Sequence, residues 1–194
     1  MHAFPTPLLK TSRLLLTWPT HEQIDDYFRS IVGTDMFDTL IWDGPSSAQE
    51  LHEWWEAGRS RDPCDFSLEF NLAIVEACSM RCIGGAGLRP LARDPRIIDI
   101  GYTLAPHSHG QGYATEAVGA LVDEAFLTRG AERVFGGCFV GNQASRRVME
   151  KLGFTLEGIQ RRAVEKNGIW IDEWLLAITR PDWQERYTCR RGSA

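Results

Sequence analysis

The chain has 194 residues, 43% of them hydrophobic, and this length suits one globular domain with a sizeable core better than two full domains. Its formal net charge of -5 comes without an obvious basic stripe, so a nucleic-acid-binding protein is not expected. The longest apolar runs are about five residues, far shorter than a membrane span. The mild acidic excess weakly suits a cationic or amine partner, but a generally soluble surface is the more common explanation.

The N-terminal part of the chain predicts one strand followed by two helices. The segment SRLLLTW (12–18) is typical of a short strand. Thr20 is the predicted N-cap of the first helix, whose apolar residues recur at helical spacing. Ser47 and Glu50 form a predicted capping box for the second helix, which we expect to end at Gly58.

Three strands and a long helix follow. Alternating or apolar patterns predict strands over 66–77, 83–90 and 97–104, with turns between them. From Ala114 the apolar positions keep to one helical face, and the helix is expected to end at 129–130.

The C-terminal part predicts a strand, a helix and a hairpin. The strand covers 133–140 and the helix lies within 141–154. The segments 155–164 and 169–178 are typical of hairpin strands joined by a KNG turn. Pro181 is expected to begin a last short turn of helix.

The predicted element order is β-α-α-β-β-β-α-β-α-β-β, with antiparallel hairpins on both sides of one β-α-β unit. This order indicates an α/β protein with a mixed, mostly antiparallel sheet and helices on both of its faces. Because the sequence has no repeat, low-complexity tract or linker, a single domain over 1–194 is expected.

The cysteines and the first residues bear on the compartment. Five cysteines occur at irregular spacing, and no Cys/His set has zinc-ligand spacing, so we expect reduced thiols and no metal. Cys138 is expected to be buried in a strand. The start, MHAFPTPLLK, lacks the pattern of a signal peptide, which favours a cytoplasmic protein.

The segment HSHGQGYATEA (107–117) places a glycine-bearing loop directly before the long helix. Free backbone N–H groups and the helix dipole make such a junction a natural anion site. Gly110 and Gly112 can adopt left-handed dihedrals and let an anion approach the backbone closely. The Walker A and G-x-G-x-x-G patterns are both absent, and a glycine-rich turn without a ligand is the alternative.

A second polar group follows the next strand. Asn142 and Ser145 lie three residues apart, so they share one helical face near the helix start. That position corresponds to the carboxyl ends of the flanking parallel strands, where open α/β sheets bind ligands. An ordinary N-cap explains Asn142 as well, and an exposed hydroxyl explains Ser145.

Three motifs in this order, IDIGYTL-x-P, GQGYATEA and NQASRRVMEKLGF-x-x-EG, resemble the GNAT superfamily of N-acetyltransferases. The segments TSRLLLTWPT and DEWLLAITRPDW are similar to its RimJ/RimL-like branch of ribosomal-protein N-acetyltransferases, so the resemblance covers nearly the whole chain. It implies the GNAT fold, with a parallel strand pair that splays apart, and the transfer of acetyl from acetyl-CoA to an amine.

The resemblance also implies a set of site residues. The pantetheine arm is expected between the splayed strands and the pyrophosphate on the loop amides. Ser145 takes the role of the acid that protonates the thiolate, because Met149 occupies the position of the family's tyrosine. The residues expected to bind acetyl-CoA are Thr103, Leu104, His109, Gly110, Gln111, Gly112, Tyr113, Ala114, Thr115, Asn142, Ser145 and Arg147.

Two positions depart from the family pattern. His109 opens the loop where Arg or Gln is usual, and an imidazole can still donate one hydrogen bond. The glutamate proposed as a base in RimL-type members corresponds to Val164, with Glu165 beside it. On a strand, that shift of one residue points the side chain to the opposite face.

Acetyl transfer needs a neutral amine, an oxyanion donor and a protonated leaving group. We expect a backbone N–H of 97–104 to stabilise the oxyanion. Ser145 is the expected acid, and Asp99 the expected base acting through water, although an exposed strand carboxylate is an alternative for Asp99. Tyr102 and Glu165 are weaker candidates, and His107 is expected to be exposed.

The acceptor is expected to bind between the first two helices, the 66–77 strand and the last hairpin. Trp42, Trp54, Trp55, Trp170 and Trp174 are candidates to line this site, although aromatic stripes more often belong to a core. Glu50, Glu53, Glu56 and Glu69 are candidates to attract a cation, with a solvated face as the alternative.

The function expected from sequence is therefore acetyl-CoA-dependent N-acetylation of a primary amine. The acceptor is a protein or peptide N-terminus or a small-molecule amine. A non-catalytic CoA-binding regulatory module is the alternative from another class, and both a monomer and a homodimer remain open.

Overall fold

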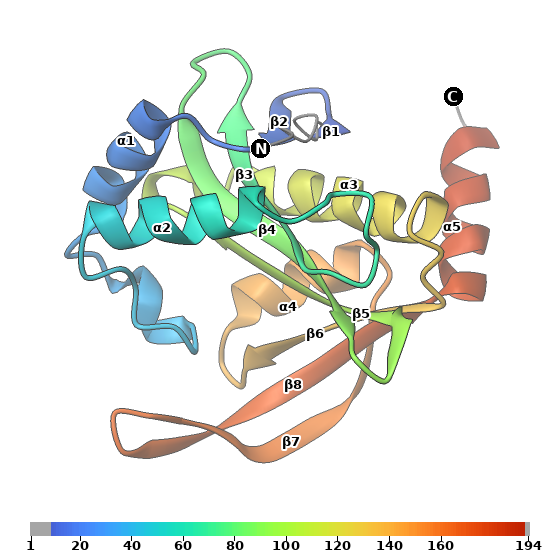
Figure 1. Ribbon diagram of the computed structural model, residues 1–194. Coiled ribbons are helices and arrows are strands. Elements are labelled where there is room, and N and C mark those ends of the chain that lie inside the picture. Colours follow the sequence, from blue (N-terminus) through green and yellow to red (C-terminus); the bar gives the residue numbers. More distant parts are fainter. Residues whose placement is uncertain (1–8, 193–194) are drawn as a thin grey trace.

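One eight-stranded sheet runs through the protein in the computed structural model, which describes residues 9–192 (Figure 1). The sheet has the order β1-β2-β3-β4-β5-β6-β8-β7. The strands are β1 (Leu9–Lys10), β2 (Leu14–Thr17), β3 (Phe70–Glu76), β4 (Cys82–Leu91), β5 (Asp94–Leu104), β6 (Arg133–Phe139), β7 (Thr155–Lys166) and β8 (Ile169–Thr179). Every neighbouring pair is antiparallel except β5 and β6, so the predicted mixed sheet is confirmed.

Helices cover both faces of this sheet, as predicted. They are α1 (His21–Ile31), α2 (Ala48–Arg59), α3 (Tyr113–Leu127), α4 (Gln143–Lys151) and α5 (Arg180–Gly192), with short 3-10 turns η1 (Asp35–Thr39) and η2 (Pro106–Ser108). Figure 1 shows α1 and α2 in front of the sheet and α3 and α4 behind it. Two buried clusters match this division: a larger one on the α3 side and a smaller one under α1 and α2.

Most predicted elements are confirmed to within a few residues, and the capping residues explain where the helices begin. Thr20 and Gln23 form a reciprocal capping box at α1. At α2 the box is incomplete: Ser47 accepts from the N–H of Glu50, but the carboxylate of Glu50 accepts from Ser46. The N-cap of α2 is therefore confirmed, while the predicted return bond goes to the preceding residue.

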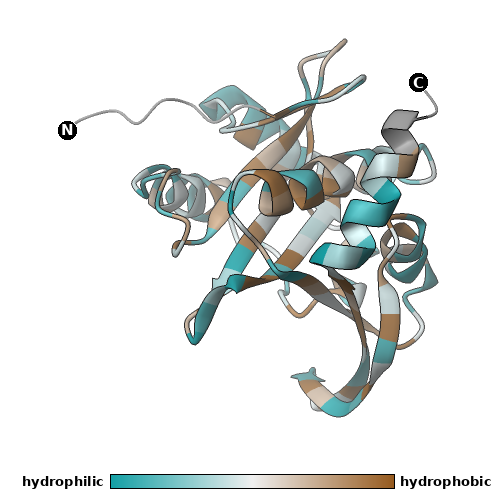
Figure 2. Ribbon diagram, turned by 90° about the vertical axis from the view of Figure 1, so that its right-hand side faces the viewer, coloured by the Kyte–Doolittle hydropathy of each residue, from teal (hydrophilic) through white to brown (hydrophobic). Residues whose placement is uncertain are grey.

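The C-terminal helix is the clearest difference from the sequence prediction. A short turn was expected at Pro181, but α5 spans 13 residues. Figure 2 shows that α5 is largely hydrophilic, which explains its weak apolar signal in the sequence. Trp183 holds it to α3, because its indole stacks on Phe126 and donates to the Asp123 carboxylate at 2.8 Å.

The parallel pair has the splay that the resemblance implied. Strands β5 and β6 pair only at Ile97–Asp99, opposite Arg133–Phe135. Beyond that seam β5 continues to Leu104 and β6 to Phe139 without pairing to each other. The carboxyl halves of two central strands therefore leave a gap in the middle of the sheet.

Two further sequence predictions concern the thiols and the first residues. Cys138 is buried in β6, as predicted, and within residues 9–192 none of the five cysteines forms a disulfide. The segment 1–8, which bears on the signal-peptide prediction, lies outside the described residues. Over residues 9–192 no helix combines the length and the apolar character needed to cross a membrane.

Candidate active site

The glycine-bearing loop lies where the sequence predicts it, between β5 and α3. Gly110 and Gly112 have φ angles of 74° and 82°, in the left-handed region that favours glycine. Gly112 is the N-cap of α3 and has no side chain to cap it. The first N–H groups of a helix lack intrahelical partners, and at α3 these are the N–H groups of Tyr113, Ala114 and Thr115, where the helix dipole favours negative charge.

Arg13 and Glu116 hold this loop in place, and sequence reasoning missed both. Arg13 donates to the carbonyl of Gln111 at 3.0 Å, and its guanidinium lies 4.5 Å from the centre of the Tyr113 ring. Glu116 accepts from the side chains of Thr11, Ser12 and Arg13 and from the N–H of Arg13. These donors, which outweigh partial burial, lower the pKa of Glu116 to about 2.

Two side chains of this segment, His109 and Tyr113, make hydrogen bonds to neighbouring strands. The Nε2 of His109 lies 2.9 Å from the carbonyl oxygen of Leu104, so this ring N–H donates to the end of β5. The hydroxyl of Tyr113 donates to Glu76 at 2.5 Å. His107 is exposed, as predicted. His109 and Gln111 are exposed as well, so the loop presents both side chains and backbone groups outward.

The open edge of β5 can be assigned residue by residue. The N–H of Ala105 donates to Ile83 of β4, and the groups of successive strand residues point to alternate edges. Tyr102 and Leu104 consequently point their backbone groups at the gap, whereas Thr103 points at β4. Thr103 and Leu104 were both expected to pair with pantetheine. Only Leu104 has its backbone groups on the open edge, because those of Thr103 face β4.

Ser145 meets Tyr102 at this gap. The Tyr102 hydroxyl lies 2.9 Å from the Ser145 Oγ and donates to the Ser145 carbonyl at 3.0 Å. Burial raises the pKa of Tyr102, against the smaller effect of its bond to Ser145. Asn142 is the N-cap of α4, because its Oδ1 accepts from the N–H of Ser145 at 3.0 Å. Arg147 is exposed on α4.

Asp99 lies on the opposite face of β5 from Tyr102, because strand side chains alternate. Its side chain is only 18% exposed and forms an ion pair with Arg89 of β4. Burial raises the pKa of Asp99, and the contact with Arg89 opposes that rise. The predicted acid and the predicted base thus flank the gap from the two faces of the sheet.

Glu173 is a carboxylate that sequence reasoning missed. It lies on β8 opposite Phe139, and its oxygens are 3.4 Å from the place of a Cβ at Gly137. Burial, followed by the charge of Asp99, raises the pKa of Glu173. Glu165 is exposed on β7 and Val164 is half-buried. The side chains of β8 alternate between the two faces of the sheet, and Glu173 lies on the α1/α2 face. This placement can be recognised only once the register of β8 in the sheet is known.

A cavity of about 510 Å³ opens between α2 and the sheet on that face. Trp42, Trp54 and Trp55 line it, whereas Trp174 lies in the core on the other face and Trp170 is exposed on the hairpin. Glu50, Glu69 and Asp99 also line it.

The two remaining candidate carboxylates lie elsewhere. Glu53 accepts from Gln49 on the exposed surface of α2, and Glu56 pairs with Arg59. For these two, the solvated-face alternative describes the structure.

The chain is similar to known acetyltransferases in sequence and in fold. The Acetyltransferase (GNAT) domain matches residues 13–155. The chain is 40% identical over 115 residues to "Probable N-acetyltransferase YjcK" of Bacillus subtilis (strain 168), over 59% of this chain and 64% of that one. It spans 64%, 56% and 50% of the lengths of three Bacillus subtilis relatives, less than two thirds of each.

Solved structures share the architecture. The microcin self-immunity acetyltransferase MccE, in complex with acetyl-CoA and AMP, has a TM-score of 0.76 at 20% identity, over 87% of this chain and 93% of that one. The apo form of RimL, a ribosomal alpha-N-protein acetyltransferase, has a TM-score of 0.76 at 20% identity, over 92% and 97%. At these identities the likeness shows the fold. Because the domain match spans more than half of the sequence, the chain belongs to the GNAT acetyltransferase family.

Proposed function

We propose that this protein is an acetyl-CoA-dependent N-acetyltransferase that acetylates a primary amine by direct attack in a ternary complex. The observation that carries the proposal is the gap between β5 and β6, with Ser145 on one face and Asp99 on the other. Family membership supports the reaction class, and the acetyl-CoA bound to the neighbour MccE supports the cosubstrate. We further propose that the chain acts as one domain in the cytoplasm.

The loop fits the pyrophosphate of acetyl-CoA. A Cβ added at Gly110 would meet nothing within 4 Å, and one added at Gly112 would lie 3.5 Å from the Arg13 guanidinium, which places a cation beside the start of α3. The N–H groups of Tyr113, Ala114 and Thr115 would hold the pyrophosphate, with Gln111 and His109 shaping the turn. The backbone groups of Leu104 would pair with pantetheine, near Asn142 on α4. Arg147 is assigned to the exposed part of the nucleotide.

Acetyl-CoA supplies an activated acetyl thioester. The neutral amine nitrogen forms a bond to the thioester carbon, the carbon–sulfur bond breaks, and the sulfur keeps the electron pair. Asp99 takes the proton that the amine releases, through water, and later returns it to solvent; Ser145 gives a proton to the sulfur and takes one back from solvent. Tyr102 orients the Ser145 hydroxyl, and the Tyr102 N–H, which faces the gap, stabilises the carbonyl oxygen.

A thiol-release assay with acetyl-CoA and a panel of amines and peptides tests the proposal, alongside calorimetric titration with CoA. We expect CoA binding together with turnover of at least one amine. CoA binding without turnover of any acceptor would instead assign the chain to the regulatory alternative. The absence of CoA binding would contradict both.

A further inference from the structure

The cavity under α2 has features that select an acceptor. Resting on the proposed N-acetyltransferase function, we propose that it binds a small primary amine with an aromatic body, such as an arylalkylamine, and not the N-terminus of a folded protein. Its volume of about 510 Å³ is that of a site for a small molecule, which typically measures about 300–1,000 Å³.

Aromatic rings form one wall of the cavity. Trp54 packs edge-to-face on Trp55, with ring centres 4.6 Å apart, and Trp42 packs in the same way on Phe37. Trp54 is nevertheless 48% exposed and Trp42 is 43% exposed, so two indoles show apolar surface at the mouth. Because neighbouring rings hold these two indoles in place while nearly half of each residue stays exposed, the indoles provide a stacking surface for a flat apolar group.

The floor of the cavity is glycine on two adjacent strands. A Cβ on Gly101 would meet no atom within 4 Å, so the empty space there comes from the missing side chain. At Gly87 the Asn71 amide fills that place instead, because its oxygen would lie 1.8 Å from an added Cβ. The floor therefore combines open space at Gly101 with one amide, that of Asn71, which can orient a polar group.

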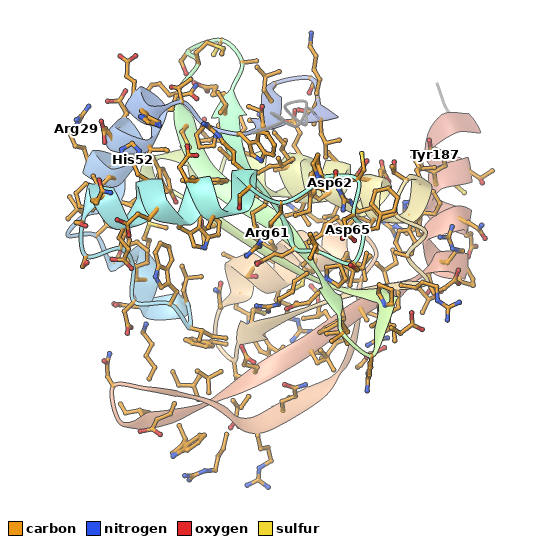
Figure 3. All side chains as sticks on the ribbon, viewed as in Figure 1. Arg29, His52, Arg61, Asp62, Asp65 and Tyr187 are labelled. Carbon is orange, nitrogen blue, oxygen red and sulfur yellow. The ribbon has the colours of Figure 1, made fainter. Side chains whose placement is uncertain are left out.

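The charges of the lining suit a cation. Three lining residues carry carboxylates, Glu50, Glu69 and Asp99; Asp99 pairs with Arg89 and Glu69 with Arg61, so the lining together with Arg61 keeps one net negative charge. Figure 3 labels Arg61, in the segment after α2, which donates to Glu69 at 2.8 Å. Hydrogen bonds from Ser46 lower the pKa of Glu50, and those from Asn71 and Arg61, against partial burial, lower that of Glu69. Both carboxylates are therefore negative at neutral pH.

The β7–β8 hairpin is bonded to the segment that carries Trp42, next to the cavity mouth. Lys166, near the tip of the β7–β8 hairpin, donates to the carbonyl of Leu40 at 2.9 Å and to Asp43 at 2.6 Å. Its side chain is only 9% exposed. The bridge joins the hairpin to the segment that carries Trp42, so the hairpin lies beside this part of the cavity mouth and leaves less room there for an extended chain.

The test compares acceptors and uses a matched pair of variants. We expect kcat/KM for 2-phenylethylamine to exceed that for hexylamine and for an alanine-initiated tetrapeptide by about tenfold. Trp54→Ala should remove most of this preference. Trp170→Ala, which removes an equally exposed indole (47%) outside the cavity, should leave it unchanged. The KM for acetyl-CoA should stay constant in both variants.

Outcomes for this inference and for the proposed function are distinguishable. Turnover that favours the tetrapeptide, or a Trp54→Ala variant that keeps the full preference, overturns the inference but leaves the acetyltransferase in place. Calorimetric titration with 2-phenylethylamine reports acceptor binding separately. If the amine binds the native protein and not Trp54→Ala while no acceptor is turned over, the cavity assignment stands and the proposed activity fails.

Discussion

The loop before α3 and the cavity under α2 lie on opposite sides of the gap in the sheet, and they are built in different ways. The loop can be recognised from a few neighbouring residues, above all Gly110 and Gly112, whose special dihedrals are local properties, although Arg13 then holds it from a distant part of the chain. The cavity is assembled from α2, β3, β4, β5 and the segment around Trp42. A local motif can be identified from sequence, whereas a surface built from distant segments emerges only on folding.

The largest expected effect is a loss of CoA affinity after a substitution in the loop before α3. Gly112→Val places a branched side chain at a φ of 82° where the backbone must meet the pyrophosphate, and we expect CoA affinity to fall at least about 100-fold. Gly130→Val is the matched control, with a φ of 67° and open space at the other end of α3. Titration calorimetry measures both, and normal CoA affinity in Gly112→Val would rule out the loop as the pyrophosphate site.

The next largest effect is expected in the cavity under α2, at Asp99. Asp99→Asn should lower kcat/KM for the amine about 100-fold, as expected for loss of a general base. Since burial raises the pKa of Asp99 above 3.8, activity should fall as pH drops through that raised value, and the variant should lose this acid limb. Glu173→Gln is the companion measurement. A larger loss of kcat/KM in Glu173→Gln than in Asp99→Asn would identify Glu173 on β8, and not Asp99, as the base.

A smaller effect on turnover is expected at Ser145, next to the gap between β5 and β6. Ser145→Ala should lower kcat about tenfold with little change in the KM for acetyl-CoA, because a serine is a weak acid and contributes modestly. Tyr102→Phe should reproduce part of this loss by releasing the Ser145 hydroxyl. Ser60→Ala, an exposed serine at the end of α2, serves as control. Unchanged turnover in Ser145→Ala would exclude it as the acid.

The smallest effect concerns stability. Glu116→Gln should lower the free energy of unfolding by about 2 kcal/mol, because several donors lose a charged acceptor. Since the folded pKa of about 2 lies below the ordinary 4.5, this stabilisation is fully present above pH 4.5 and is lost as pH falls toward 2. Glu150→Gln, which breaks only the exposed pair with Arg146, should cost about 0.5 kcal/mol or less. Chemical denaturation at several pH values checks both, and equal losses would contradict the role of Glu116.

The same division explains how far the sequence alone could go. Element types, the mixed sheet and the loop follow from periodicity, capping residues and glycine positions, all of which are local. The extents of α5 and β3 were predicted less accurately. The exposed residues of α5 give a weak apolar signal, and a turn at Asp65 delays the start of β3 to Phe70, four residues after the predicted start. Trp174 was proposed for the acceptor site, yet it lies in the core on the other face, a distinction that only sheet register decides.

Pairs formed across the molecule could not be predicted at all. Tyr102 and Ser145 are 43 residues apart, and Lys166 reaches Leu40 over 126 residues. Nothing in the spacing of one sequence marks such partners. Asp99 was identified as a carboxylate on the correct strand, but its partner Arg89 required the antiparallel register of β4 and β5.

The bonds from Thr11, Ser12 and Arg13 to Glu116 also have a consequence for folding. They close loops of 103 to 105 residues, and contacts of such sequence separation are slow to form. The glycines can adopt their dihedrals early, but the turn is fixed only after β2 has docked beside α3. Ligand-binding competence at the loop therefore marks the completion of the tertiary structure, and refolding followed by CoA binding would register one of its last steps.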